Sequence, residues 1–135
     1  MIYEICASSF ESAKNAEISG ATRIELCSEL GVGGVTPSYG LIKKVMDELS
    51  IGNCVLIRPR SGNFTYTDEE FDVMLRDINL CRELGCQGVV TEYYIAITQL
   101  MKNVLHASKK LQVLWNLSII VLLIVPPIPL LQLKP

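Results

Sequence analysis

Histidine is almost absent from this sequence, since His106 is the only one among 135 residues. One imidazole cannot build a histidine-rich metal centre, and we interpret His106 as a surface or half-buried residue rather than a catalytic base. The five cysteines also lack the spacing of a zinc site, because Cys81 and Cys86 stand five residues apart and no second pair follows them. These shortages exclude the common zinc-binding motifs and leave no recognisable set of nucleophile, base and orienting acid.

Basic residues are too few and too scattered for a nucleic-acid-binding surface. The chain has 12 lysines and arginines against 14 acidic residues, a net charge of −2. The first residues also lack a basic segment followed by an apolar run, so no secretory signal is predicted. We therefore expect a cytoplasmic protein with reduced thiols and no nucleic-acid partner.

Glycine and charge are both missing from the last part of the chain. All nine glycines precede residue 91, and residues 111–133 contain no charged side chain. An uninterrupted helix could cover only residues 111–125, which is 15 residues, whereas crossing a bilayer takes roughly 20. Because Pro126 and Pro127 block its continuation, we do not expect a membrane anchor.

Short apolar runs alternate with longer amphipathic segments in the first 90 residues, which is the pattern of βα units. Their spacing suits crossover connections that build one parallel sheet within a single α/β domain. The strands are predicted at residues 2–7, 22–27, 53–59 and 87–90, and the helices at 9–19, 37–49 and 67–84. A further helix over 97–110 and a strand over 111–115 are predicted beyond them.

Local sequence also predicts where each helix begins. One of the serines at 8–9 is expected to cap the first helix. Thr36 is expected to cap the second helix, with Pro37 at its first position. Thr67 and Glu70 have the spacing of a capping box at the start of the third helix.

Charged and thiol side chains recur on one face of each of the first three predicted strands. Alternate residues of a strand point to the same face of a sheet, and parallel strands covered on both faces are normally apolar throughout. Two explanations stay open: ion pairs between these residues inside the sheet, or a ligand pocket where the strands end. The residues are Glu4 and Cys6 on the first strand, Arg23, Glu25 and Cys27 on the second, and Leu56, Arg58 and Arg60 on the third.

The loops after the second and third strands allow two interpretations each. The segment GVGGVTPS, residues 31–38, offers backbone amides at a helix start, a geometry that can hold an anion. It matches neither the phosphate-binding loop with its lysine nor the dinucleotide fingerprint, so an ordinary turn before a capped helix is the alternative. Arg58 and Arg60 either bind a carboxylate or phosphate, or belong to a strand exit in which Pro59 and Gly62 turn the chain.

Four motifs in this order resemble the amino-terminal half of the CutC copper homeostasis protein family: RIELC, GGVTPSYG, IRPRSGNF and YTDEEFDVM. The resemblance runs over residues 2–90. It implies a (β/α)8 TIM barrel, of which this chain would contain about four βα units, in a cytoplasmic protein that forms homo-oligomers and takes part in copper handling. The family pattern falls on Glu4, Arg23, Glu25, Cys27, Arg58 and Arg60.

Two functions follow as hypotheses. The resemblance makes Cys27 the first candidate for binding copper(I), and Cys6 would share its face on a neighbouring strand about 4.8 Å away. The alternative is an enzyme of unassigned reaction that acts on a small anionic metabolite. In that case the candidates are Glu4 and Glu25 as general acid or base, and Arg23, Arg58 and Arg60 as ligands of the anion.

The sequence departs from the family pattern after Val90. The family continues with a glycine, a loop, an FHRAFD-like strand and several more βα units, and this chain shows none of these features. We therefore expect residues 1–90 to form a partial barrel. We expect residues 91–135 to be a divergent segment of frameshifted or mis-spliced origin, with an atypical apolar tail.

Overall fold

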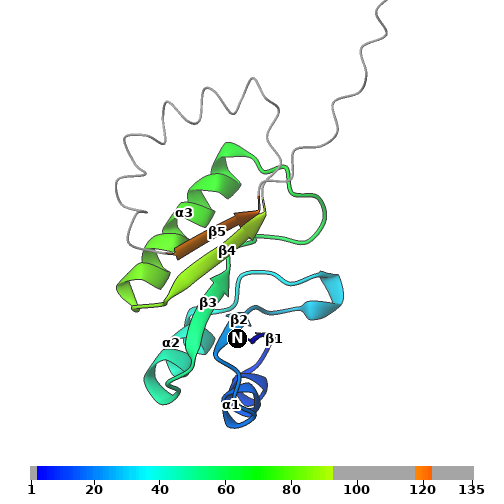
Figure 1. Ribbon diagram of the computed structural model, residues 1–135. Coiled ribbons are helices and arrows are strands. Elements are labelled where there is room, and N and C mark those ends of the chain that lie inside the picture. Colours follow the sequence, from blue (N-terminus) through cyan, green and yellow to red (C-terminus); the bar gives the residue numbers. More distant parts are fainter. Residues whose placement is uncertain (1–2, 93–117, 123–135) are drawn as a thin grey trace, which may run out of the picture.

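The computed structural model describes residues 3–92 and 118–122. Within these ranges strands and helices alternate along the chain, as the sequence pattern predicts (Figure 1). The elements are β1 (Glu4–Ala7), α1 (Phe10–Ile18), β2 (Arg23–Leu26), the 3-10 turn η1 (Leu30–Val32), α2 (Tyr39–Glu48), β3 (Gly52–Leu56), α3 (Asp68–Glu83), β4 (Gly88–Glu92) and β5 (Ser118–Leu122).

The strands form one parallel sheet in the order β1-β2-β3-β4-β5. Successive strands are therefore neighbours, and helices α1, α2 and α3 provide the first three crossovers. The prediction of an α/β fold built from parallel βα units is confirmed.

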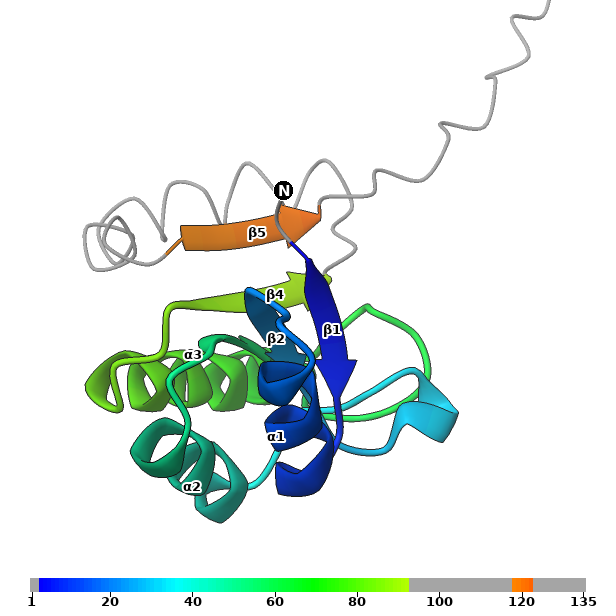
Figure 2. The same ribbon diagram turned by 60° about the horizontal axis from the view of Figure 1, so that its bottom comes forward.

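The helices α1, α2 and α3 lie on one side of the sheet (Figure 2). Alternate residues of β2, β3 and β4 point to this side and are buried, because strand side chains alternate with a period of two. We call this surface the helix face. Its central residues are Ile24, Leu26, Val55, Ile57 and Val89, and they share one core with Ala13, Ala16, Ile42, Val45, Met74 and Cys81 of the helices.

Helices α1 and α3 begin as predicted. The hydroxyl of Ser9 accepts a hydrogen bond from the backbone N–H of Ser12 at 3.1 Å, so Ser9 is the cap of α1. Thr67 and Glu70 form the predicted capping box, because the Thr67 hydroxyl accepts from the Glu70 N–H and the Glu70 carboxylate accepts from the Thr67 N–H. Two otherwise unpaired N–H groups at the start of α3 are thereby satisfied.

The predicted start of α2 is wrong by two residues. Ser38, not Thr36, caps this helix, and its hydroxyl accepts from the Leu41 N–H at 3.2 Å. Thr36 instead forms two hydrogen bonds with the backbone of Arg58. Its hydroxyl accepts from the Arg58 N–H at 2.8 Å, and its own N–H donates to the Arg58 carbonyl at 2.9 Å. A contact distant in sequence therefore overrides the local capping signal.

Strand β3 ends at Leu56, three residues before the predicted end at residue 59. Ile57 still donates to the Val90 carbonyl at 2.7 Å, but Arg58 pairs with Thr36 instead of a sheet neighbour. Arg60 consequently lies in the following loop and does not continue the alternation of Leu56 and Arg58. The expectation that all three share one strand face is wrong for Arg60.

Several sequence predictions lie outside the described residues: the helix over 97–110, the strand over 111–115 and the assignment of His106. Residues 118–122, inside the charge-free stretch, form strand β5 beside β4, with Val90 paired to Ile120. In the part of the chain that the structure describes, none of the helices combines the length and the apolar character required to cross a membrane.

Candidate functional site

The sheet surface opposite the helices carries most of the predicted site residues, and we call it the polar face. Paired residues of parallel strands point to the same face, so the register decides which side chains are neighbours. Glu4 is paired with Arg23, Cys6 with Glu25, and Glu25 with Cys54. The polar face therefore consists of Glu4, Cys6, Arg23, Glu25, Cys27 and Cys54. Leu56 and Arg58 extend it, because they follow Cys54 at intervals of two residues along β3 and just beyond its end.

Glu4 and Arg23 lie at the amino ends of β1 and β2 and form an ion pair through the Arg23 Nε atom. Both side chains remain partly exposed to solvent. An open recess of about 580 Å³ lies at this same end and is lined by Tyr3, Glu4, Ile5 and the Ser19–Ala21 turn. This part of the polar face matches the ion-pair explanation, and it is remote from the carboxyl ends of the strands.

Cys6, Glu25 and Cys27 lie together toward the carboxyl ends of β1 and β2. The Cys27 N–H donates to the Ala7 carbonyl at 2.9 Å, which extends the ladder that pairs Cys6 with Glu25. Cys27 is buried and Cys6 is exposed. Burial raises the pKa of the Cys27 thiol, and the neighbouring Cys6 and Glu25 raise it further.

Glu25 is the half-buried carboxyl group of this cluster. Burial raises its pKa, and repulsion by Glu4 adds to the effect. The pKa of Cys6 is raised for a related set of causes, first burial and then the charges of Glu25 and Glu4. Protonated forms of all three groups are therefore favoured more than in a free peptide.

The glycine-rich loop after β2 lies directly on Cys27 and Leu56. A Cβ atom added at Gly34 would stand 2.7 Å from Leu56 Cδ2 and 3.7 Å from the Cys27 sulfur. Gly34 also has a φ of +87°, which side chains rarely adopt. Close backbone approach thus explains the glycine, and it covers the Cys27 thiol.

Arg58 ties this loop to the one after β3. Its guanidinium donates to the carbonyls of Val32 at 2.9 Å, Gly34 at 2.7 Å and Gly62 at 2.8 Å. The same group stacks on Phe64, 4.6 Å from the ring centre. The side chain is buried, and its Nε atom has no hydrogen-bond partner among the residues that the structure describes.

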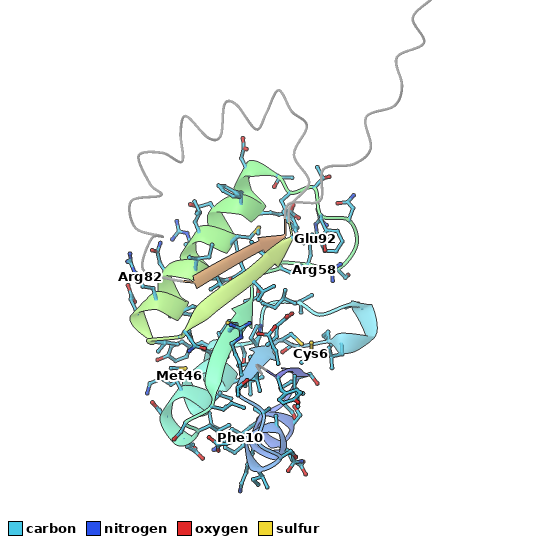
Figure 3. The ribbon with its side chains drawn as sticks, viewed as in Figure 1. Cys6, Phe10, Met46, Arg58, Arg82 and Glu92 are labelled. Carbon is cyan, nitrogen blue, oxygen red and sulfur yellow. The ribbon has the colours of Figure 1, made fainter. Side chains whose placement is uncertain are left out.

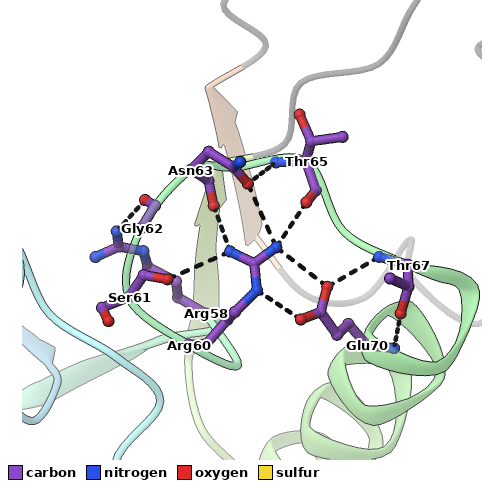
Figure 4. A network of polar contacts seen from close by, with 8 residues as sticks. All are labelled: Arg58, Arg60, Ser61, Gly62, Asn63, Thr65, Thr67 and Glu70. Carbon is purple, nitrogen blue, oxygen red and sulfur yellow. Dashed lines mark hydrogen bonds and ion pairs between the residues drawn. The ribbon is translucent and has the colours of Figure 1, made fainter.

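Arg60 holds the second loop together (Figure 4). It donates to both carboxylate oxygens of Glu70, the shorter contact being 2.5 Å, and to the carbonyls of Asn63 at 2.9 Å and Thr65 at 2.7 Å. The Arg60 guanidinium and the Thr67 N–H lower the pKa of Glu70. Arg60 therefore links the loop to the first turn of α3.

Sequence reasoning missed several residues around these arginines. Figure 3 labels Glu92, the last residue of β4, and the charge of this residue raises the pKa of Tyr66. The buried Tyr66 also belongs here, because burial raises its pKa while the charges of Arg58 and Arg60 lower it. Cys54 could have been predicted from the sequence, since it stands two residues before Leu56 on the same strand and therefore points to the same face. No local sequence pattern identifies Tyr66 or Glu92 as site residues.

The structure thus separates the predicted site residues into three groups. Glu4 and Arg23 pair at the amino end of the sheet, and Cys6, Glu25 and Cys27 cluster toward the other end. Arg58 and Arg60 organise the loops through backbone carbonyls and Glu70. Within residues 3–92 and 118–122, no group of three or more histidine, cysteine or acidic side chains is arranged to hold a metal ion, so any thiolate site there rests on a pair.

A parallel sheet with helices on one face, a polar opposite face and ordered loops at its carboxyl ends defines part of a TIM-barrel protein. A sequence model described as the CutC family matches residues 1–116. The chain belongs to the CutC family, as its sequence motifs indicate.

Individual relatives match a shorter segment. A family protein CutC of Pasteurella multocida (strain Pm70) is 49% identical over 90 residues, which is 67% of this chain and 37% of that protein. The corresponding protein of Xylella fastidiosa (strain 9a5c) is 51% identical over 87 residues, 64% of this chain and 33% of that protein. The chain spans about a third of the length of these curated relatives.

A solved structure shows the same arrangement of elements. The crystal structure of CutC from Streptococcus agalactiae, a protein named for copper homeostasis, matches with a TM-score of 0.71 and 32% sequence identity. The match covers 90% of this chain and 59% of that one. The described βα units therefore correspond to part of the CutC barrel, while the origin of residues 91–135 stays a prediction.

Proposed function

We propose that this chain is a portion of a CutC-type protein of copper homeostasis, and that Cys27 and Cys6 are its copper(I) ligands. The observation that supports the site is the β1–β2 register, which places both thiols on the polar face toward the carboxyl ends of the strands. Membership of the CutC family and the name of the Streptococcus agalactiae relative support the link to copper.

The donor set suits copper(I). This soft ion prefers thiolates, and two sulfur ligands are enough for it. Cys6 supplies an exposed thiol through which the ion can enter, and Cys27 supplies a buried thiol under Gly34. When bound, copper(I) would replace the two thiol protons.

Glu25 would reduce the electrostatic cost of this site. Two thiolates and one copper(I) ion carry a net charge of −1, and an ionised carboxylate beside them would repel this charge. The raised pKa of Glu25 favours its neutral form. Because the pKa values of both thiols are also raised, proton competition weakens binding as the pH falls.

The test is an anaerobic titration of the full chain with copper(I) against a chromophoric chelator. We expect Cys27→Ser to abolish binding of the ion held by the polar face, and Cys6→Ser to weaken it at least about tenfold, which is about 1.4 kcal/mol. Cys54→Ser is the matched control, because Cys54 is a buried thiol on the same face. Each of the three substitutions is made separately in a chain that also carries Cys81→Ser and Cys86→Ser. This removes copper binding by the thiols of Cys81 and Cys86 from the comparison.

Unchanged copper binding in Cys27→Ser would remove this assignment. Equal losses in Cys27→Ser and Cys54→Ser would also contradict it, since they would indicate a general loss of structure rather than a lost ligand.

The second candidate function is an enzyme that acts on a small metabolite bearing a carboxylate or phosphate. The half-buried Glu25, whose pKa is raised, has the protonation behaviour of a general acid or base. Under this hypothesis Glu4 is the alternative acid or base, and Arg23, Arg58 and Arg60 are the candidate anion ligands.

A thermal-stabilisation screen with anionic metabolites tests this second candidate. A true ligand should raise the melting temperature of the chain, and Glu25→Gln should reduce its turnover while leaving the ligand-induced stabilisation in place. Arg58→Ala should abolish the stabilisation. A screen in which no metabolite stabilises the unmodified chain would count against the enzyme hypothesis.

A further inference from the structure

Cys81 and Cys86 occupy the two ends of a tight turn at the carboxyl end of α3. The Cys86 N–H donates to the Cys81 carbonyl at 3.0 Å, and the Gly85 N–H donates to the Arg82 carbonyl at 3.1 Å. Gly85 has a φ of +79°. These two bonds and the left-handed glycine define a Schellman motif, in which Cys81 is the third helical residue from the end and Cys86 the second residue beyond the cap.

This motif brings the two side chains together. The residues at these two positions of a Schellman turn commonly contact each other. Here both are cysteines, and both are buried in the same core, with exposed fractions of 0% for Cys81 and 5% for Cys86. A hydrogen bond between the thiols lowers the pKa of Cys86 and raises that of Cys81. Cys86 is therefore the more nucleophilic partner.

A metal complex fits this pair less well than a disulfide. Two thiolates holding a monovalent ion would place a net negative charge in an apolar core, where charge is costly. Asp77 adds to the cost because it already repels negative charge on Cys81. A disulfide is neutral, and it requires the two sulfur atoms to reach bonding distance with a Cβ–S–S–Cβ dihedral angle of roughly 90°.

We propose that Cys81 and Cys86 form a reversible intrachain disulfide when the protein meets hydrogen peroxide. The Cys86 thiolate attacks one peroxide oxygen and the O–O bond breaks, which gives a sulfenic acid and hydroxide. The Cys81 sulfur then attacks the Cys86 sulfur, the S–O bond breaks, and the leaving oxygen departs as water with the Cys81 proton. The hydroxide takes up the proton that Cys86 lost on ionisation, so the two thiols lose two electrons and two protons in total and the peroxide is reduced to two molecules of water.

The expected consequence is local. The new bond closes a loop from Cys81 to Cys86 and fixes the last turn of α3 to the residues that enter β4. Helix ends open more readily than helix centres, and opening of this turn would admit peroxide to Cys86. The site lies on the helix face and is independent of the copper site proposed on the polar face.

Tryptic mapping tests the proposal directly, because Arg82 stands between the two cysteines at the end of α3 (Figure 3). The full chain is treated with peroxide, its free thiols are alkylated, and it is digested without reductant. Trypsin separates residues 77–82 from residues 83–102 in the reduced chain. We expect these two peptides to stay joined after oxidation, with a mass lower by two hydrogen atoms, and to separate after treatment with dithiothreitol.

Variants at Gly85 test whether the turn is responsible. No heavy atom lies within 4 Å of a Cβ atom added there, so a substitution acts only through the left-handed backbone. Gly85→Val should slow disulfide formation several-fold, because β-branched residues strongly avoid this conformation. Gly85→Asn should keep more of the rate, since asparagine tolerates it, and Gly40→Ala in α2 should leave the rate unchanged.

Three results would overturn the proposal. The first is alkylation of both Cys81 and Cys86 after exposure to peroxide. The second is a linkage of Cys86 to Cys54 in place of Cys81, which would place the reactive pair elsewhere in the core. The third is an equal rate in Gly85→Val and the unmodified chain, which would separate the disulfide from the turn.

Discussion

Leu26 on the helix face and Glu25 on the polar face are adjacent in β2, yet their surroundings are opposite. Leu26 is fully buried among aliphatic side chains of the core, whereas Glu25 is half-buried beside two thiols and a second carboxylate. The helix face gains free energy from removing apolar area from water. The polar face gains less in this way, because only Cys27, Cys54 and Leu56 of its members are buried apolar side chains, and every charge on it must find a partner or remain near solvent.

The charges of the polar face meet this requirement in different ways. Arg23 pairs with Glu4, and Arg58 donates to three backbone carbonyls. Glu25 forms no ion pair with any residue in the described part of the chain, and burial and the charge of Glu4 raise its pKa, which reflects the cost of ionising it. A face that costs free energy to maintain is typical of a functional site, whereas the helix face accounts for the stability of the fold.

The largest effect is expected from an alanine on the helix face. Leu26→Ala should lower the free energy of unfolding by about 2–5 kcal/mol, because it leaves a cavity in a closely packed core. Glu25→Ala, its neighbour on the polar face, should change the same quantity by less than about 1 kcal/mol. Urea unfolding followed by circular dichroism measures both, and similar losses at the two positions would mean that the two faces contribute alike.

The next largest effect is expected at the carboxyl end of the polar face. Arg58→Met keeps the apolar stem but removes the donors to Val32, Gly34 and Gly62, and should cost about 2–3 kcal/mol because buried carbonyls lose their partners. Arg76→Met on the surface of α3 is the control and should be nearly neutral. Hydrogen exchange should show lost protection at Thr36. Retained protection there would contradict the role of Arg58 in joining the loops.

A matched pair of glycines tests how closely the loop approaches the polar face. Gly34→Ala should destabilise the chain by about 1–2 kcal/mol, through its left-handed backbone and the contact with Leu56. Gly40→Ala in α2, with open space around it, should stabilise the chain by about 0.5–1 kcal/mol. The same sign of change at both positions, in parallel thermal melts, would show that the loop does not pack on Cys27 as described.

The smallest effects are expected from pH, and they should have opposite signs at two glutamates. The folded chain binds the Glu25 proton more tightly than the unfolded chain, so stability should fall as the pH rises above about 4.5 toward the raised pKa. Glu25→Gln should remove this slope.

Glu70 should show the reverse behaviour. Its pKa is lowered by Arg60 and the Thr67 N–H, so its contribution is present above about pH 4.5 and is lost as the pH falls through the lowered value. Glu70→Gln should therefore lose stability at neutral pH and match the unmodified chain in acid. Parallel slopes for the two variants in urea titrations across this range would contradict both assignments.

Much of the fold could be predicted from the sequence because its signals are local. Alternation of apolar residues located four strands, and Thr67 with Glu70 located the start of α3 to the residue. The failures arose where a distant residue competes for a local group. Thr36 has the side chain of a helix cap, but Arg58 occupies its hydroxyl, and the same pairing ends β3 before residue 59.

The candidate site was predictable only in part, for a similar reason. Alternation placed Cys6 and Cys27 on one face, but only the register of β1 and β2 aligned Cys6 with Glu25. Arg58 and Arg60 have the chemistry of anion ligands in the sequence, yet Arg58 donates to carbonyls of two loops and Arg60 to Glu70. Nothing in the local sequence reveals which acceptors the folded chain brings to a guanidinium.

The sequence by itself therefore determined the succession of βα units, the alternation that divides the sheet into two faces, and membership of the CutC family. Hydrophobic periodicity and helix capping depend on residues only a few positions apart. They therefore predict the same elements in any fold that buries the apolar side of each element. Only the tertiary structure decided that Glu4 pairs with Arg23, that Gly34 covers Cys27 and that Arg58 joins two loops. These contacts depend on strand register and loop closure, which bring together groups as far as 19 residues apart for Glu4 and Arg23 and 24 for Arg58 and Gly34.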